Sequence, residues 1–276
     1  DGCRHMTRAY SEKEDFSLLK NAVLEAGALA LAGLGKTNLE TWLKRGVEPV
    51  SEIDLAVNDL LKKTLMEARP DYGWLSEEST DDSTRLDKNL VWVVDPIDGT
   101  RAFIKGAKDF SICVALLKGD RPILSVLFAP ARDEFFSAMK NRGAFLNNNK
   151  IQVGTASRIP GIKLQGDEGY FKNVKRWQTP WPEMTFGKYQ SFALRIASVA
   201  AGNFDAAISA RPKSEWDVAA ADLIVTEAGG ICCDGEGKAF VYNQKNTRLA
   251  EIVATIPGLL PEILERMQGR KPKNTS

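Results

Sequence analysis

The stretch Leu90-Val-Trp-Val-Val-Asp-Pro-Ile-Asp-Gly-Thr100 decides how this chain is interpreted. Its apolar start, Leu90 to Val94, predicts a buried strand, and Thr100 to Ile104 is typical of a short helix. Asp95 and Asp98 lie between these two elements, where paired carboxylates can share hard divalent cations. The free N–H groups of a helix start can hold an anion beside them. The stretch therefore predicts a metal next to a phosphate, the arrangement of metal-assisted phosphoryl chemistry.

An alternative interpretation of the same residues is an Asp-Pro turn followed by an Asp-Gly turn. Two further motifs argue against it: the acidic loop Leu75-Ser-Glu-Glu-Ser79, and Trp216-Asp-Val-Ala-Ala220, which continues to Glu227-Ala-Gly-Gly230. In order and spacing, the three motifs resemble the signatures of the inositol monophosphatase superfamily. Its members are metal-dependent, lithium-sensitive phosphomonoesterases. The resemblance extends from about Ser11 to Pro257.

The resemblance implies a fold as well as a chemistry. We expect a layered α-β-α-β-α sandwich, an α+β or α/β fold of the inositol monophosphatase and fructose-1,6-bisphosphatase type, with the active site between two halves. The N-terminal α+β half, residues 1–157, would contain the main metal site. The smaller C-terminal α/β half, residues 158–276, would supply Asp217 and substrate contacts.

Composition limits the classes of protein that are possible. The chain has 276 residues, 43% hydrophobic and 26% charged, which is ordinary for a globular protein with a substantial core. Its 37 basic and 36 acidic side chains give a net charge of +1, which argues against nucleic acid as the main partner. The longest apolar run is shorter than the roughly 18 residues of a membrane span, and we expect no transmembrane segment.

The start, Asp1-Gly-Cys-Arg-His-Met6, is interpreted as a leader of vector sequence ahead of a natural Met6. His5 is the single histidine of the chain and lies in that leader, so we expect no histidine-based catalysis and no His-ligated zinc. The cysteines beyond it are Cys113, Cys232 and Cys233, whose spacing fits neither a zinc site nor a disulfide framework. A reducing compartment, and hence the cytoplasm, is the predicted location.

Periodicity predicts two amphipathic helices near the start, Ser11 to about Leu34 and Ser51 to Ala68. The first should bury Phe16, Leu19, Val23 and Leu24. Predicted strands follow at 111–117 and 123–128, joined by a Gly-Asp turn, and at 134–139 and 144–153, with an Asn-rich turn inside the last. After Thr155, strands alternate with helices in the segments 161–164, 173–177, 192–201, 206–209 and 215–228. The tail from Gly269 to Ser276 is expected to fray.

The resemblance assigns the metal ligands. Asp95 and Asp98 are the first two, and the backbone carbonyl of Ile97 is a further one. Glu77 is chosen over Glu78, because the first Glu of the family's acidic pair is the ligand; otherwise, an acidic Ser-rich loop of this kind is usually just solvated. The expected cofactor is Mg²⁺, with two or three ions per site.

Asp217 also has a structural explanation, because Ser214-Glu-Trp-Asp217 reads as a capping box at a helix start. The resemblance adds the role of ligand to a second metal. Asp54 and Thr100 form the candidate water-activating pair, since Val50-Ser-Glu-Ile-Asp54 aligns with a Val-Thr-x-x-Asp pattern of the family. The alternatives are an exposed helix position for Asp54 and an ordinary first helical residue for Thr100. The N–H groups of Gly99 and Thr100 are the expected phosphate contacts.

The substrate is inferred from the residues that follow the Asp-Gly-Thr motif. After Asp-Gly-Thr, this chain continues with Arg101-Ala-Phe-Ile-Lys105, where inositol monophosphatases usually have Thr-Asn-Phe, and it resembles bacterial 3'(2'),5'-bisphosphate nucleotidases. Arg195, Arg211 and Lys213 could bind a second phosphate, although each is also explained as surface charge. The 3'-phosphate of adenosine 3',5'-bisphosphate is therefore the predicted target.

Other substrates, and a non-enzymatic function, stay open beside this prediction. Inositol 1-phosphate is the main alternative, and fructose 1,6-bisphosphate is a weaker candidate. Some bacterial relatives act as partners of the transcription machinery, which would make the chain a binding protein. We expect a small phosphorylated metabolite as partner and leave a homodimer open.

Overall fold

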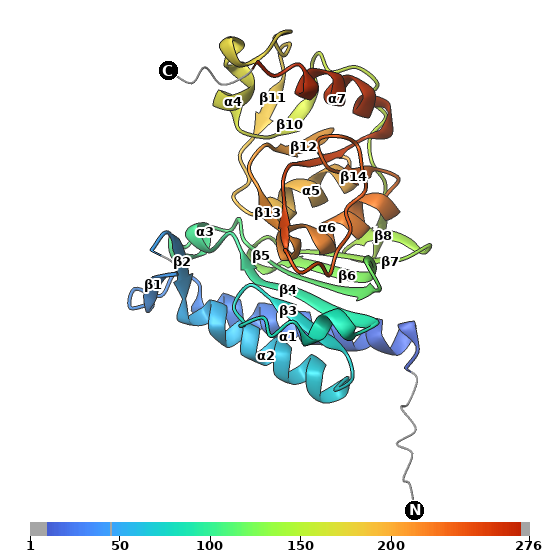
Figure 1. The fold of residues 1–276 in the computed structure, drawn as a ribbon. Helices are drawn as coiled ribbons and strands as arrows, with labels where there is room; N and C mark the ends of the chain where they lie inside the picture. Colours follow the sequence, from blue (N-terminus) through green and yellow to red (C-terminus); the bar gives the residue numbers. More distant parts are fainter. Residues whose placement is uncertain (1–9, 45, 272–276) are drawn as a thin grey trace, which may run out of the picture.

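The computed structural model describes residues 10–44 and 46–271. The leader with His5, and the part of the tail from residue 272 onward, lie outside the described residues. The chain builds five layers, which Figure 1 shows from bottom to top. They are a helix pair, a large sheet, a second helix pair, a small sheet and an outer helical layer, so the predicted α-β-α-β-α sandwich is confirmed.

The large sheet has seven strands in the order β3-β4-β5-β6-β7-β8-β9, and only the β3–β4 pair is parallel. Hairpins join β5 to β6 through the predicted Gly-Asp turn and β8 to β9 through the predicted Asn-rich turn. The strands are β3 (Gly73–Ser76), β4 (Leu90–Asp98), β5 (Ser111–Lys118), β6 (Arg121–Ala129), β7 (Glu134–Met139), β8 (Gly143–Leu146) and β9 (Asn149–Ile151).

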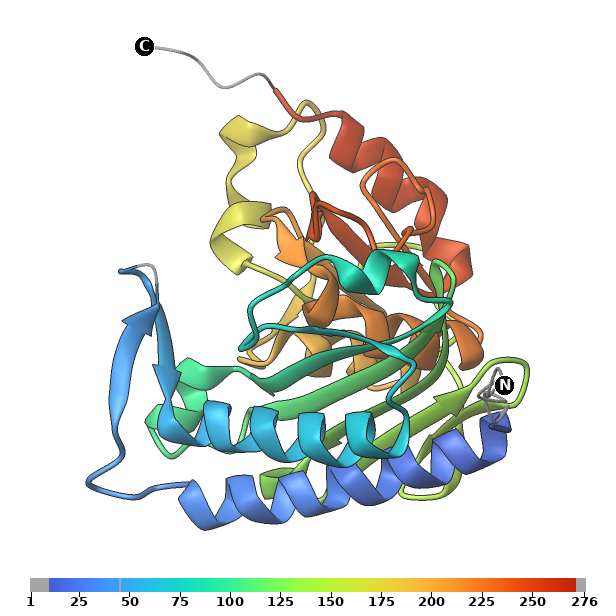
Figure 2. The same cartoon turned by 60° about the horizontal axis from the view of Figure 1, so that its bottom comes forward.

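Helices α1 (Glu12–Gly33) and α2 (Glu52–Ala68) cover the outer face of this sheet and lie side by side (Figure 2). Ser11 and Ser51 cap them, each in a capping box with the acid three residues on. Leu24 is 49% exposed, so its predicted place on the buried stripe is wrong. By length and composition alone α1 could cross a membrane, but one face of it packs against α2 and β6.

The small sheet has five strands in the order β11-β10-β12-β16-β14. Its strands are β10 (Lys163–Gln165), β11 (Thr185–Gly187), β12 (Ala206–Ser209), β14 (Ile231–Cys233) and β16 (Ile252–Thr255). Helices α4 (Glu168–Lys172) and α7 (Leu260–Gln268) lie on its outer side (Figure 1), where Phe171, Ile263 and Met267 join one apolar cluster with the sheet. Short 3₁₀ turns lie at Thr84–Asp87 (η1), Pro130–Arg132 (η2), Val174–Arg176 (η3) and Pro257–Leu259 (η4).

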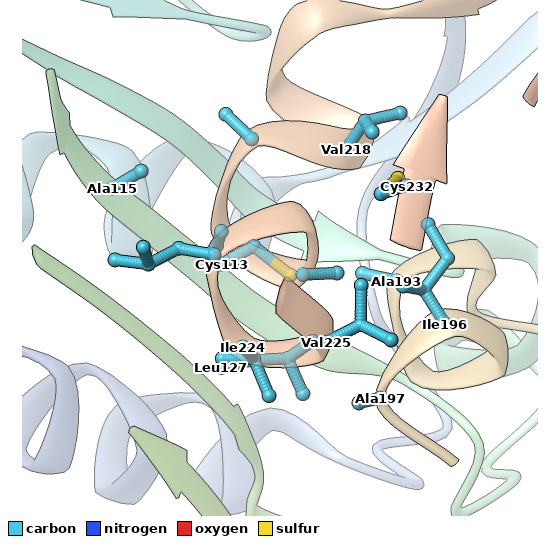
Figure 3. Close-up of a cluster of buried hydrophobic side chains, with 14 of the residues drawn as sticks. Cys113, Ala115, Leu127, Ala193, Ile196, Ala197, Val218, Ile224, Val225 and Cys232 are labelled. Atoms are coloured by element: carbon cyan, nitrogen blue, oxygen red, sulfur yellow. The ribbon is translucent and has the colours of Figure 1, made fainter. Parts of the chain in front are cut away.

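Helices α5 (Phe192–Ala200) and α6 (Glu215–Glu227) fill the layer between the two sheets. Figure 3 shows part of this packing: Val225 of α6 lies beside Ile196 and Ala197 of α5, and Ile224 of α6 lies beside Leu127 of the large sheet. The alanines 219–221 of α6 are buried, and such small side chains let the backbone approach the sheet closely. Both parts of the chain contribute to this core, and the division at residue 157 stays a prediction.

Several segments differ from expectation. The strand predicted over 90–94 continues to Asp98, because a bulge lets it keep pairing with β5. A hairpin of β1 (Thr41–Lys44) and β2 (Glu48–Ser51) leads into α2 (Figure 2), and a small pair joins β13 (Lys213–Ser214) to β15 (Arg248–Leu249). Neither pair was predicted. Gly269 and Lys271 do not fray, because their backbones hydrogen-bond to the segment 176–178.

The middle layer generates a stability prediction. Leu127 of β6 is fully buried beneath α6, so Leu127→Ala should lower the free energy of unfolding by about 2–5 kcal/mol, from lost burial plus a cavity. Urea denaturation measures this change. Leu31→Ala on the exposed side of α1 is the control and should stay within about 0.5 kcal/mol of the wild type. Equal losses in the two variants would contradict the core described above.

Candidate functional site

A β-bulge in β4 orients the first two carboxylates. Asp95 pairs with Cys113 and Asp98 with Ser111, so three steps along β4 match two steps along β5. In a regular strand, residues three apart point to opposite faces, whereas the extra residue turns both side chains to the same side. Pro96 lies inside the bulge, where its missing N–H costs no ladder bond. The bulge therefore aims Asp95 and Asp98 at the layer that contains α5 and α6.

Three carboxylates from distant parts of the chain converge on that side. Oxygen atoms of Glu77, Asp95 and Asp217 lie within 4.8 Å of one another. Glu77 follows β3, Asp95 belongs to β4, and Asp217 lies in the first turn of α6. Asp95 is 1% exposed, and neither of its carboxylate oxygens has a hydrogen-bond partner among the described residues. Burial and the charges of its acidic neighbours hold the pKa of Asp95 well above its usual range.

The pKa values of Glu77 and Asp217, the other two members of this cluster, are also raised. Burial raises the pKa of Glu77 to about 8, and the charge of Lys44 opposes that shift while Asp217 adds to it. Lys44 reaches from the β1–β2 hairpin to Glu77 Oε1 at 3.3 Å and to Glu78 Oε1 at 2.7 Å. Burial raises the pKa of Asp217 to about 6, against the charge of Lys213. Ser214 donates its backbone N–H to Asp217 Oδ2 at 2.7 Å, as the capping interpretation predicted.

Asp98 lies beside the cluster and is held by the start of α5. Its Oδ2 accepts hydrogen bonds from the Ser191 hydroxyl and from the Ala193 N–H, the latter at 2.7 Å. Burial raises the pKa of Asp98, and the positive charge of Lys213 opposes this. The Ile97 carbonyl oxygen lies 3.0 Å from the Thr100 hydroxyl oxygen. Whether Ile97 and Asp98 bind metal stays a prediction.

Asp54 and Thr100 meet as the sequence predicted. The Thr100 hydroxyl donates to Asp54 Oδ1 at 2.8 Å, and the other Asp54 oxygen accepts the hydroxyl and the N–H of Ser51. Asp54 is buried rather than exposed, and this burial raises its pKa, although the bonds from Ser51 and Thr100 lower it in part. The hydrogen bond between the two side chains is present, and their role in activating water stays a prediction.

Gly99 caps α3 (Thr100–Ile104) in a conformation that requires glycine. Its φ is +97°, and a Cβ there would lie 2.9 Å from the carbonyl oxygen of Asp109. The N–H groups that open α3 have no partner within the helix. Their use as phosphate contacts stays a prediction.

The three predicted cations differ in position. Lys213 extends over the ring of Phe192, 4.5 Å from its centre, and its charge acts on Asp98 and Asp217. Arg195 is half-buried in the first turn of α5, where its Nε donates to the Tyr189 carbonyl at 2.6 Å. Arg211 is 88% exposed and lies 3.9 Å from Asp167. Of the three, Lys213 is the one electrostatically linked to both Asp98 and Asp217.

Sequence reasoning missed the residues that support the carboxylates. Ser51 could have been found, because Ser-Glu-Ile-Asp54 has the Ser-x-x-acid spacing of a capping box. Lys44 and Ser191 carry no local signal. They reach Glu77 and Asp98 only through tertiary folding.

The donor set suits a hard divalent cation. Carboxylate oxygens in close convergence are the ligands that Mg²⁺ and similar ions prefer. Buried carboxylates without a counter-ion or a hydrogen bond are otherwise costly. Asp95 therefore fits a cation better than it fits a purely structural role.

Comparison with known proteins agrees with this site. Residues 12–267 match the family described as the Inositol monophosphatase family, and the chain belongs to that family. It is a family of phosphatases that are generally metal-dependent and act on small phosphorylated substrates. The "Inositol-1-monophosphatase" of Rhizobium meliloti is 34% identical over 80% of this chain and 85% of its own length. A "Nus factor SuhB" of Pasteurella multocida is 31% identical over 90% of this chain and 93% of its own.

Solved structures show the same fold. The extragenic suppressor protein suhB of Bartonella henselae superposes with a TM-score of 0.79 at 26% identity, over 94% of this chain and 98% of its own. An IMPase of Thermotoga maritima gives a TM-score of 0.78 at 27% identity, over 94% of this chain and 97% of its own.

The raised pKa values predict how the metal-free protein responds to pH. Carboxylates in the unfolded chain titrate near pH 4, whereas the folded protein raises the pKa of Asp217 to about 6 and that of Glu77 to about 8. The cluster therefore favours the folded state at low pH, and this contribution is lost as the pH rises from about 4 through about 8.

In excess chelator at pH 8, Asp95→Asn should be more stable than the wild type by about 1 kcal/mol or more, the equivalent of one pKa unit. The gap should close toward pH 4.5, where the cluster is protonated in both proteins. Chemical denaturation across this range measures it, and Glu25→Gln on the exposed side of α1 is the control. A variant less stable than the wild type at pH 8 would contradict the inference that the ionised carboxylate cluster destabilises the metal-free protein.

Proposed function

We propose that this protein is a Mg²⁺-dependent phosphomonoesterase. The observation that carries the proposal is the convergence of Glu77, Asp95 and Asp217, with both oxygens of Asp95 buried and free of partners among the described residues. Membership of the inositol monophosphatase family supports the reaction class. Glu77, Asp95, Asp98, Asp217 and the Ile97 carbonyl would hold two or three Mg²⁺ ions.

Bound Mg²⁺ would supply positive charge for the phosphoryl oxygens and would make water acidic enough to act as a nucleophile near neutral pH. Side chains of the protein would then accept the proton that the attacking water loses. When the Thr100 hydroxyl donates its hydrogen to Asp54, the hydroxyl oxygen can accept a proton from the attacking water. Asp54 can take the Thr100 proton in exchange, at the Oδ1 that already accepts it.

The phosphate group would be held by the start of α3. Gly99 keeps the backbone bare of a side chain, so the N–H groups of Gly99 and Thr100 can approach an oxyanion closely. No histidine or cysteine takes part in this scheme. Cys113 is buried, and burial raises the pKa of its thiol well above the usual range, which makes it a poor nucleophile.

Removing the central carboxylate tests the reaction class. Phosphate release should require Mg²⁺ and stop in excess chelator, and Asp95→Asn should lower kcat by several orders of magnitude while circular dichroism shows a folded protein. Glu25→Gln is again the control and should keep full activity. Li⁺ should inhibit at concentrations where Na⁺ does not. Full turnover in chelator would rule out the metal-dependent reaction.

We propose adenosine 3',5'-bisphosphate as the substrate, with the 3'-phosphate as the group removed. Two features support a second phosphate in the substrate: the Lys213 ammonium beside Asp98, and the Arg195 guanidinium, whose bond to Tyr189 uses Nε and not the terminal nitrogens. Arg211 would approach from the exposed rim. Inositol 1-phosphate is the second candidate, because a relative at 34% identity is named for that activity.

Substitution of Arg195 tests whether the preferred substrate carries a second phosphate. Each charge-assisted hydrogen bond contributes roughly 1.5–3 kcal/mol, so Arg195→Ala should lower kcat/KM for the bisphosphate about ten- to a hundredfold. The loss for adenosine 3'-monophosphate, which lacks the second phosphate, should be much smaller. Lys172→Ala, an exposed cation of α4, is the control variant. A higher kcat/KM for inositol 1-phosphate than for the bisphosphate would overturn the substrate assignment.

A transcription-associated role is the non-enzymatic alternative, and relatives named Nus factor SuhB support it. Retention of all four predicted ligand carboxylates supports catalysis over a purely binding role. Fructose 1,6-bisphosphate remains a weaker substrate candidate. The homodimer and the cytoplasmic location stay predictions.

A further inference from the structure

Two buried charged side chains near the cluster have no part in the chemistry above. Arg85 belongs to η1, in the segment that links Glu77 to β4, and is 1% exposed. Glu215 opens α6, the helix whose first turn carries Asp217, and is fully buried. Both bind the same two residues, Asn243 and Gln244. We call these four residues the 243–244 clamp.

The N-terminal side of the clamp is made by one guanidinium. Arg85 donates from Nη1 to the Asn243 side-chain carbonyl at 2.7 Å and from Nη2 to the Gln244 backbone carbonyl at 3.0 Å. Asn243 returns a bond from its amide nitrogen to the Arg85 carbonyl at 3.2 Å. Two further bonds, at 3.1 and 2.7 Å, tie the guanidinium to Asp81, which lies in the same segment after Glu77. The segment that follows the acidic loop is thereby fixed to Asn243 and Gln244.

The C-terminal side of the clamp is made by one carboxylate. Glu215 accepts the backbone N–H of Asn243 at 2.8 Å and that of Gln244 at 2.9 Å, one on each oxygen. Asn243 has a φ of +58°, a left-handed conformation that asparagine tolerates. Charge-assisted bonds between buried groups are strong and geometrically specific. The start of α6 is thereby fixed to the same backbone that holds Arg85.

Glu77 and Asp217 come from distant parts of the sequence, and their carboxylates lie within 4.8 Å of each other and of Asp95. Cation binding needs these carboxylates ionised, and repulsion between the ionised groups favours separation of the acidic loop from α6. We infer that the 243–244 clamp is a positioning device that holds Glu77 and Asp217 together against this repulsion and so sets the affinity for Mg²⁺. This inference rests on the proposed metal-dependent function.

Two variants remove different contacts of the 243–244 clamp. Asn243→Gly keeps the left-handed backbone and the N–H bond to Glu215 but removes the side chain that Arg85 binds. Glu215→Gln removes the charge that holds the 243–244 backbone to α6. Arg69→Gln is the matched control, because Arg69 also forms a buried ion pair, with Asp15, between α1 and α2 on the outer side of the large sheet.

The primary measurement is the Kd of Mg²⁺, obtained by titration calorimetry on the whole protein without substrate. Residues that support ligands typically change metal affinity roughly 10- to 100-fold, and we expect a loss of this size for Glu215→Gln and a smaller one for Asn243→Gly. At saturating Mg²⁺, kcat should return close to the wild-type value, because bound ions then hold the ligands. Arg69→Gln should lose thermal stability without a change in Kd.

The outcomes separate the possibilities. Clamp variants that melt earlier but bind Mg²⁺ like the wild type would overturn the inference and leave the clamp a purely structural contact. A wild-type protein that binds no Mg²⁺ would overturn the proposed function and the clamp together. If Glu215→Gln does not fold, Asn243→Gly and Arg85→Lys decide by the same measurement.

Discussion

The structure depends on one electrostatic constraint: several carboxylates must stay close together in a buried place. In most of these carboxylates, one oxygen accepts hydrogen bonds from a neighbouring segment of the chain. Asp98 gives Oδ2 to the start of α5, Asp217 gives Oδ2 to Ser214, and Asp54 gives one oxygen to Ser51. The other oxygen of Asp54 accepts the Thr100 hydroxyl. Asp95 is the exception, since neither of its oxygens has a partner in the described part of the chain.

Helix starts supply the counter-charge that this arrangement needs. Asp54 lies in the first turn of α2, Thr100 opens α3, Ala193 lies in the first turn of α5, and Asp217 lies in that of α6. The N-terminal end of a helix carries a partial positive charge that stabilises nearby anions. Four helices from different parts of the fold therefore begin around the site. Their N-terminal ends help to stabilise the acidic cluster in the folded protein.

Sequence reasoning succeeded where the signal is local. Periodicity located α1, α2 and strands β4 to β9 of the large sheet, and the run ending in Thr100 located Asp95 and Asp98. The resemblance of residues 50–54 to a family pattern paired Asp54 with Thr100, and the two side chains do meet. It failed where placement is tertiary, as for Ser191, or where a short polar segment has little periodicity, as for the hairpin that carries Lys44. The bulge is an intermediate case. The odd spacing of Asp95 and Asp98 around a proline implies it, once both side chains are required on one face.

The core shared by the two parts of the chain has a consequence for biosynthesis. The large sheet is complete in sequence at Ile151, but the residues that cover its inner face, those of α5 and α6, come 41 to 76 positions later. A nascent chain therefore displays an uncovered apolar sheet, flanked by Glu77 and Asp95 without Asp217, until α6 leaves the ribosome. Exposed surfaces of this kind are where partly folded chains associate. The interval between these segments is the period in which the growing protein most needs a chaperone.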